Sequence, residues 1–148
     1  MNHRILPPTY LLMAMLVIVL LHILAPLAYI VRMPWNLLGL LPLGLGLIVT
    51  AVADRAFKQR GTTVHPFKEP TQVVTNGVFR FSRNPMYLGF VLVLLGMAIL
   101  LRSLSPFAIV GGFAIWMDIG FIRVEERILA ATFGDEWVRY KRRIRKWV

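Results

Sequence analysis

The sequence contains no cysteine and few acidic residues, and both shortages narrow what the protein can be. Without cysteine, the 148-residue chain has no disulfide, no thiolate nucleophile and no cysteine-ligated metal site. Seven acidic residues stand against 17 lysines and arginines, so the formal net charge is +10. Only 16% of the residues are charged and 57% are hydrophobic. That composition is too apolar for an ordinary soluble domain of this size.

Four segments are almost free of charge and predict membrane-spanning helices. They are residues 10–31, 33–53, 86–101 and 104–121. A spanning helix needs about 20 apolar residues. The first two segments reach that length, the third is short, and the fourth contains one acid, Asp118. The first segment is also too long for the apolar part of a typical signal peptide. We therefore predict an all-α integral membrane protein with about four transmembrane helices, forming a single domain over residues 1–148.

The distribution of basic residues predicts how these helices are oriented. Of the 17 lysines and arginines, 15 fall before the first segment, in the middle loop of residues 54–84, or after the fourth segment. The positive-inside rule then places both termini and the middle loop in the cytoplasm. The basic residues lie close to the membrane ends, so we expect them to meet anionic lipid headgroups rather than nucleic acid. The lack of signals for internal membranes favours a prokaryotic plasma membrane.

A cluster of polar residues stands where the middle loop enters the third apolar segment. The stretch RNPMYLG, residues 83–89, places Pro85 at the first helical position and Asn84 before it as a helix cap. A pair of glutamates, Glu125 and Glu126, follows the fourth segment. Because the last two helices form an antiparallel hairpin, we expect both groups to meet at the cytoplasmic membrane face. Capping and interfacial anchoring explain the first group alone, whereas a polar site explains both.

The middle loop and the C-terminal segment are both predicted to be ordered. Apolar residues are spaced through the loop, which is unlike a disordered linker. After a helix break at Phe133-Gly134, apolar residues recur at helical spacing among basic ones. This pattern predicts an amphipathic helix on an anionic membrane surface. Its apolar residues are Trp137, Tyr140, Ile144 and Trp147.

Two titratable residues inside the apolar segments each have two interpretations. An acid within the membrane is costly, so Asp118 is either a functional residue or part of a structural ion pair, with Arg123 or Arg102 as candidate partners. His22 is either a hydrogen-bonded structural residue or a functional one. Asp118 and Glu125 are seven residues apart and would share one face of an α-helix.

Glycines in the second apolar segment predict close packing against a neighbouring helix. They are Gly39, Gly44 and Gly46. They do not form a phosphate-binding loop, because no Lys-Ser or Lys-Thr pair follows and the surrounding run is apolar.

Four pieces of the sequence, in order, resemble the isoprenylcysteine carboxyl methyltransferase and phospholipid methyltransferase family of integral membrane enzymes. The first is the loop histidine His65 in GTTVHPF. The second is VVTNGVFRFSRNPMYLG, residues 73–89. The third and fourth are EERILAATFG, residues 125–134, and EWVRYKRR, residues 136–143. The resemblance covers about residues 60–148. Eukaryotic members carry histidine where this chain has Asn84, which keeps a hydrogen-bond donor and acceptor but does not titrate.

The resemblance implies S-adenosylmethionine as cofactor, S-adenosylhomocysteine as product and no metal. The residues that it implies for cofactor binding are Val64, His65, Asn84, Tyr87, Leu88, Gly89, Glu125 and Glu126. Glutamates suit the ammonium and ribose hydroxyls of the cofactor, and glycine permits close approach of cofactor or backbone. Arg83 is the candidate for aligning an anionic acceptor, and Glu126 is the residue whose loss should abolish activity. Most of the catalysis would be positioning and orientation.

The methyl acceptor and two other classes of function stay open at this point. An isoprenylcysteine-type carboxylate, a phospholipid amine, and a small lipophilic thiol or acid all fit a site that opens to the bilayer. The alternatives to a methyltransferase are a non-enzymatic membrane scaffold or lipid-binding protein, and an NADPH-dependent membrane reductase.

Overall fold

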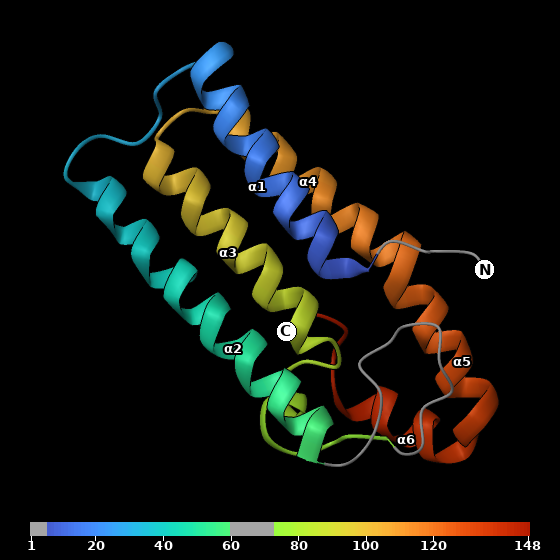
Figure 1. Ribbon diagram of the computed structural model, residues 1–148. Coiled ribbons are helices and arrows are strands. Elements are labelled where there is room, and N and C mark those ends of the chain that lie inside the picture. Colours follow the sequence, from blue (N-terminus) through green and yellow to red (C-terminus); the bar gives the residue numbers. More distant parts are fainter. Residues whose placement is uncertain (1–5, 60–72) are drawn as a thin grey trace.

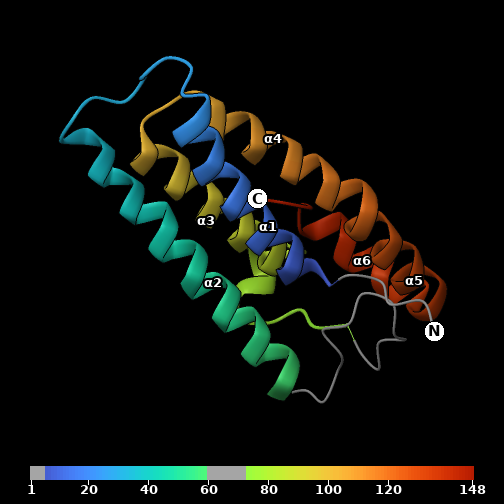
Figure 2. The ribbon, with the colours of Figure 1, turned by 45° about the horizontal axis from the view of Figure 1, so that its top comes forward.

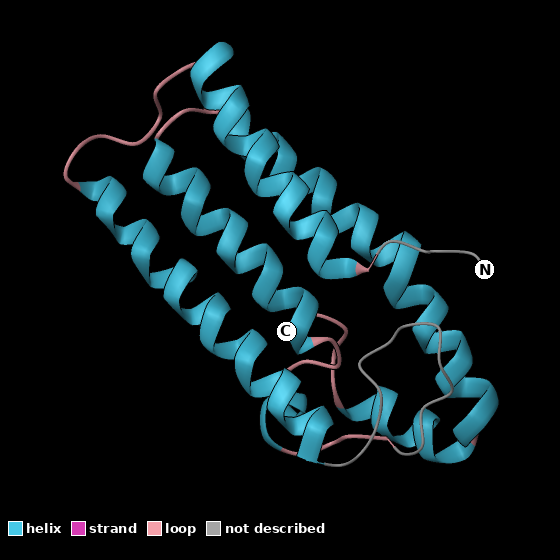
Figure 3. Cartoon of the chain, viewed as in Figure 1, coloured by secondary structure: helices cyan, strands magenta, loops and turns pink. Residues whose placement is uncertain are grey.

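A computed structural model describes residues 6–59 and 73–148, which fold as a helical bundle (Figures 1 and 3). The helices are α1 (Pro7–Leu24), α2 (Leu40–Gln59), α3 (Pro85–Leu101), α4 (Ser105–Met117), α5 (Arg123–Phe133) and α6 (Asp135–Arg143). Two 3₁₀ segments, η1 (Trp35–Gly39) and η2 (Gly77–Arg80), lie before α2 and before α3. A π-helical segment, η3 (Asp118–Ile122), joins α4 to α5. The predicted cofactor residues Val64 and His65 lie outside the described residues.

Three helical stretches in the described part of the chain are long and apolar enough to cross a membrane. They are Pro7–Leu24, Trp35–Gln59 and Ser105–Phe133. The all-α integral membrane class predicted from the sequence is therefore confirmed. Helix α3 has 17 residues, and at about 1.5 Å per residue it is about 25 Å long. That is shorter than the hydrocarbon core of about 30 Å, so a fourth span stays a prediction.

The helix boundaries differ from the predicted segments for local reasons. Helix α1 ends at Leu24 rather than near residue 31, because Pro26 disfavours helical backbone at the preceding Ala25, whose φ is −144°. Helix α2 continues six residues past the predicted end, into a charged stretch of good helix formers. The helical stretch Ser105–Phe133 ends at the predicted break, where Gly134 has a φ of 47°.

Helix α3 lies between α2 on one side and the α1–α4 pair on the other (Figures 1 and 2). Glycines bring α3 against α2 and η1. A Cβ at Gly46 of α2 would be 2.5 Å from the Gly89 carbonyl, and a Cβ at Gly96 would be 2.5 Å from the carbonyl of Gly39, the last residue of η1. The predicted close packing is confirmed for Gly39 and Gly46. It is wrong for Gly44, because no atom of another element among the described residues lies within 4 Å of its Cβ position.

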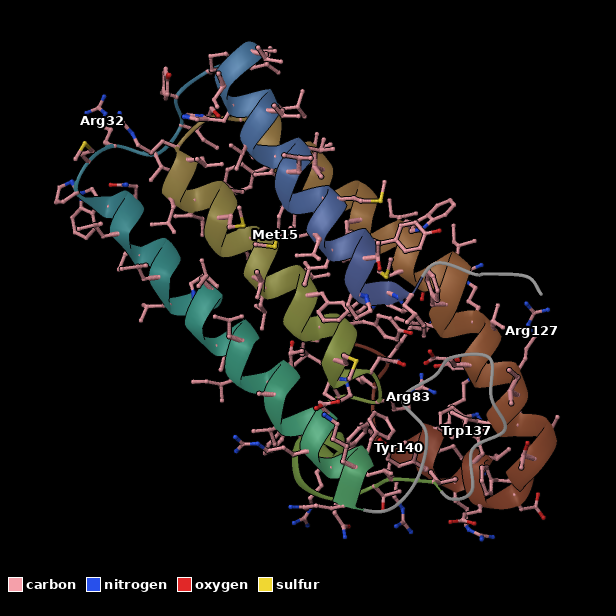
Figure 4. All side chains as sticks on the ribbon, in the orientation of Figure 1. Met15, Arg32, Arg83, Arg127, Trp137 and Tyr140 are labelled. Carbon is pink, nitrogen blue, oxygen red and sulfur yellow. The ribbon has the colours of Figure 1, made fainter. Side chains whose placement is uncertain are left out.

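Hydrogen bonds close the end of the bundle opposite the predicted site. The turn before α4 bonds to the segment after α1, where the Leu104 N–H donates to the Ala28 carbonyl at 2.9 Å. Nearby, His22 Nδ1 lies 2.8 Å from Ser103 Oγ. This contact supports the interpretation of His22 as a hydrogen-bonded structural residue, with the Ser103 hydroxyl as its partner. Arg32 lies at this same end, far from Arg83 (Figure 4).

The C-terminal helix is shorter than predicted, and part of its apolar face is inside the protein. Helix α6 ends at Arg143, and Ile144 has extended backbone, so Trp147 does not continue the helical face. Trp137 and Tyr140 are 4% and 8% exposed and pack with Val73 of the middle loop. The prediction that these two aromatic residues lie on the membrane is therefore wrong, because they are buried in a cluster with Val73, Leu129 and Phe133.

Candidate active site

The start of α3 and the start of α5 bring four polar side chains together. Tyr87 Oη donates a hydrogen bond to Glu125 Oε1. Arg83 Nη1 lies 3.1 Å from Glu126 Oε1. The prediction that the RNPMYLG stretch meets the glutamate pair is confirmed, because α3 runs antiparallel to the continuous α4–η3–α5 stretch (Figure 1).

Local sequence features place these side chains. Pro85 occupies the first position of α3, where its missing N–H is not needed. On the facing helix, the π-helical segment η3 adds a residue to one turn just before Glu125. The prediction that Asp118 and Glu125 share a helix face assumed α-helical spacing. That spacing does not apply here, because the π-helical segment lies between the two residues. Asp118 instead contacts Arg123 and Lys146.

The Arg83–Glu126 pair is buried but incompletely hydrogen-bonded. The two side chains are 6% and 11% exposed. Arg83 Nε, Arg83 Nη1 and Glu126 Oε1 each lack an aligned hydrogen bond within the described residues. A buried polar atom without a partner is costly. Although Arg83 Nη1 and Glu126 Oε1 face one another as an ion pair, their unused hydrogen-bonding capacity among the described residues suits a polar ligand.

Helix α6 supplies a second cation and an aromatic platform that the sequence analysis did not assign. Lys141 Nζ is 3.3 Å from Glu126 Oε2. The Arg83 guanidinium lies over the Trp137 ring, 5.7 Å from its centroid (Figure 4). Trp137 and Lys141 are four residues apart and so share a face of α6. That spacing was visible in the sequence and predicts a shared face, but it does not by itself show that the face is turned towards the site.

Tyr140 of α6 is hydrogen-bonded to the 3₁₀ segment η2, which precedes Arg83 in the chain. Its hydroxyl donates a hydrogen bond to the Phe79 carbonyl at 2.7 Å. Burial raises the pKa of this hydroxyl to about 12, although the Arg83 guanidinium opposes the shift. Tyr140 therefore stays neutral at physiological pH and acts as a hydrogen-bond donor.

Asn84 has structural contacts that the sequence did not predict, whereas Gly89 makes the close approach to a neighbouring backbone that was one of its two predicted roles. Asn84 does not cap α3 with its side chain. Its Nδ2 donates to the Lys146 carbonyl at 3.1 Å, and its N–H donates to Ser82 Oγ at 3.1 Å. A Cβ on Gly89 would be 2.2 Å from Thr50 Oγ1 of α2, so this glycine serves helix packing. The roles of Asn84, Gly89 and Leu88 in cofactor binding stay predictions.

The geometry is that of a membrane protein with a polar site at one end of an apolar bundle. Buried charges inside apolar helices are expensive and are typical of functional sites. Sequence comparison gives the family: residues 35–136 match phospholipid methyltransferases. Because this match covers more than half of the chain, the protein belongs to the phospholipid methyltransferase family.

Two curated relatives share part of the chain. A protein-S-isoprenylcysteine O-methyltransferase of Saccharomyces cerevisiae is 38% identical over 74 residues, which are 49% of this chain and 30% of the relative. A methanethiol S-methyltransferase 1 of Bradyrhizobium diazoefficiens is 35% identical over 75 residues, which are 51% of this chain and 25% of the relative. The matched part thus spans less than a third of either relative. No solved structure matches the chain significantly.

Proposed function

We propose that the protein transfers a methyl group from S-adenosylmethionine to a lipophilic acceptor embedded in the membrane. The observation that carries this proposal is the meeting of Arg83 and Tyr87 with Glu126 and Glu125 at one end of the bundle. Family membership supports the reaction class, and both relatives are named as methyltransferases.

The residues of this cluster fit the cofactor. When bound, S-adenosylmethionine supplies a methyl group carried on a positively charged sulfur. Glu125 and Glu126 suit its ammonium group and ribose hydroxyls, because carboxylates accept charge-assisted hydrogen bonds. Glu126 Oε1 is buried and lacks an aligned donor among the described residues, so it has capacity for such a bond. Tyr87 orients Glu125 through its hydroxyl.

Arg83 and Lys141 would align the acceptor and balance the charge of the glutamates. The planar guanidinium of Arg83 suits a carboxylate, because it offers paired donors in a fixed geometry. Trp137 holds that guanidinium from one side. An isoprenylcysteine-type carboxylate needs no deprotonation, whereas a phospholipid amine has to lose a proton before it attacks. Arg83 therefore favours the carboxylate, and a thiol is the acceptor that the name of the second relative suggests.

The membrane orientation is part of the same proposal. The exposed basic residues of α6 would lie against the anionic lipids of the cytoplasmic leaflet. The site would then take its cofactor from the cytoplasm and its acceptor from the bilayer. A prokaryotic plasma membrane is the proposed location.

The decisive experiment is transfer of radiolabelled methyl from S-adenosylmethionine to a total lipid extract by the purified protein. Glu126→Gln should abolish the labelled product. Glu136→Gln is the matched control, because Glu136 is an exposed glutamate on α6. Chromatography of the product would identify the acceptor.

Binding measurements separate the alternatives. A membrane scaffold would bind no S-adenosylhomocysteine, and a reductase would bind NADPH in preference. If the wild-type protein produced no labelled lipid and bound no S-adenosylhomocysteine, the methyltransferase proposal would be overturned.

A further inference from the structure

The segment that follows α6 crosses the start of α3 and is hydrogen-bonded to it. We call residues 144–147 the C-terminal strap. The Arg83 N–H donates to the carbonyl of Arg145 at 3.1 Å. The side-chain amide of Asn84 donates to the carbonyl of Lys146 at 3.1 Å. The strap therefore holds the backbone of the residue whose side chain reaches Glu126.

An ion pair fixes the strap to the facing helix. Lys146 Nζ donates to Asp118 Oδ1 at 2.7 Å, and Arg123 Nε donates to Asp118 Oδ2 at 2.9 Å. Asp118 is 17% exposed and Lys146 is 30% exposed. Arg123 follows Asp118 by five residues, which is the hydrogen-bonding repeat of the π-helical segment between them. The segment that disturbs the regular helix thus supports the acid that binds the strap.

Hydrophobic contacts anchor the strap at both ends. Ile144 packs against the cluster of Val73, Trp137 and Tyr140. Trp147 packs against the main core of the bundle. Between these anchors, the Asp118–Lys146 pair adds an ionic contact from the strap to the α4–η3–α5 stretch.

We propose that Asp118 and Lys146 are positioning residues for methyl transfer. Their ion pair holds the strap, and the strap fixes the backbone from which Arg83 reaches Glu126. This inference rests on the proposed function, because it assigns the pair an effect on the rate of that reaction. Loss of the pair should let the backbone at Arg83 move, and small misplacements of a positioned group cost rate.

The pair is expected to act locally rather than on the stability of the whole protein. Partly exposed ion pairs contribute little to overall stability. The strap is four residues long, whereas the main core is formed by α1, α3 and the α4–η3–α5 stretch. Variants of the pair should therefore fold, and their rates should be measurable.

The test uses Lys146→Met and Asp118→Asn, with Lys146→Arg as the conservative variant. We expect kcat to fall about tenfold in the first two and to recover in the third. The affinity for S-adenosylhomocysteine, measured by titration calorimetry, should fall less than kcat, because Glu125 is held by its own hydrogen bond from Tyr87. Lys58→Met is the matched control, since Lys58 forms an exposed ion pair of 2.6 Å with Asp54 on α2.

A spin label reports the strap independently of activity. The chain has no cysteine, so Arg145→Cys places a single label on the strap, and Arg139→Cys places one on α6 as a control. Adding Lys146→Met should increase the mobility of the label at position 145 and leave the label at position 139 unchanged.

Each outcome decides between parts of the proposal. An unchanged label at position 145 would overturn the role of the ion pair in holding the strap. A freed label with full kcat would overturn the positioning role. A wild-type protein that transfers no methyl group would overturn the proposed function, while the label would still show whether the ion pair holds the strap.

Discussion

Replacing Gly96 by alanine tests the close approach of α2 and α3. A Cβ at this position would lie 2.5 Å from the Gly39 carbonyl oxygen and 2.6 Å from both the Cβ and the backbone nitrogen of Leu43. Ordinary van der Waals contact begins at 3.4 Å, so the shortfall against the carbonyl is 3.4 minus 2.5, or 0.9 Å. Backbone atoms cannot rotate away as a flexible side chain can, and the two helices have to separate.

The expected cost follows from two opposing effects. Overpacking a well-packed contact costs about 1–3 kcal/mol. Alanine recovers up to about 1 kcal/mol relative to glycine inside a helix. Gly96→Ala should therefore lower the free energy of unfolding by about 1 kcal/mol, within a range of about 0–2 kcal/mol. Gly112→Ala in α4 is the control, because within the described part of the chain no other element comes within 4 Å of its Cβ position. The control should be as stable as the wild type or slightly more so.

The assay is equilibrium unfolding in mixed micelles with increasing dodecyl sulfate, followed by circular dichroism. The two variants carry the same chemical change in helices, so their difference isolates the overpacking. A double variant of Gly39 and Gly96 should be less destabilised than the sum of its single variants, because both changes push apart the same contact. Equal stability of Gly96→Ala and Gly112→Ala would refute the close approach.

Three further predictions concern the site and its surroundings. Tyr87→Phe removes the donor that orients Glu125, and should weaken binding of S-adenosylhomocysteine about tenfold; unchanged affinity in calorimetry would contradict this. Arg83→Lys keeps the charge but loses the planar fork, and should slow methyl transfer about tenfold; a full rate in the radiolabel assay would remove Arg83 from the site. The pKa of Tyr140 is raised to about 12 from 10.0, so its neutral hydroxyl stabilises the fold fully below pH 10 and progressively less towards pH 12. Tyr140→Phe, which loses the bond to Phe79, should cost about 1 kcal/mol and weaken that alkaline loss; an equally steep loss in the variant would assign it to other groups.

The sequence was sufficient to predict the contact between the start of α3 and the glutamate pair. An antiparallel hairpin requires that contact once two apolar segments are joined by a short turn. The resemblance in the RNPMYLG stretch and the glutamate pair pointed to the same place. The helix break at Gly134, which has a positive φ, was also recognisable from residue type.

Other features depend on contacts between distant residues, and sequence patterns do not reveal those. The strap bonds residues 62 positions apart, as in Asn84 and Lys146. The π-helical segment has no local signature, so the spacing between Asp118 and Glu125 was assigned to a regular α-helix. Trp137 has the spacing of a surface amphipathic helix, and only its packing against Val73, Leu129 and Phe133 shows that it is buried. In each case the local sequence fits more than one conformation or position equally well, and tertiary contacts decide which one the protein adopts.

The short length of α3 has a consequence for bilayer thickness. If α3 spans the bilayer as predicted, its length of about 25 Å falls about 5 Å short of the hydrocarbon core. Hydrophobic mismatch of this kind is relieved by local thinning of the bilayer. Any thinning would draw the headgroups of nearby lipids down to the level of Arg83, which stands two residues before the helix. Methyl transfer should then depend on acyl-chain length and run faster in thin vesicles than in thick ones of the same headgroup composition.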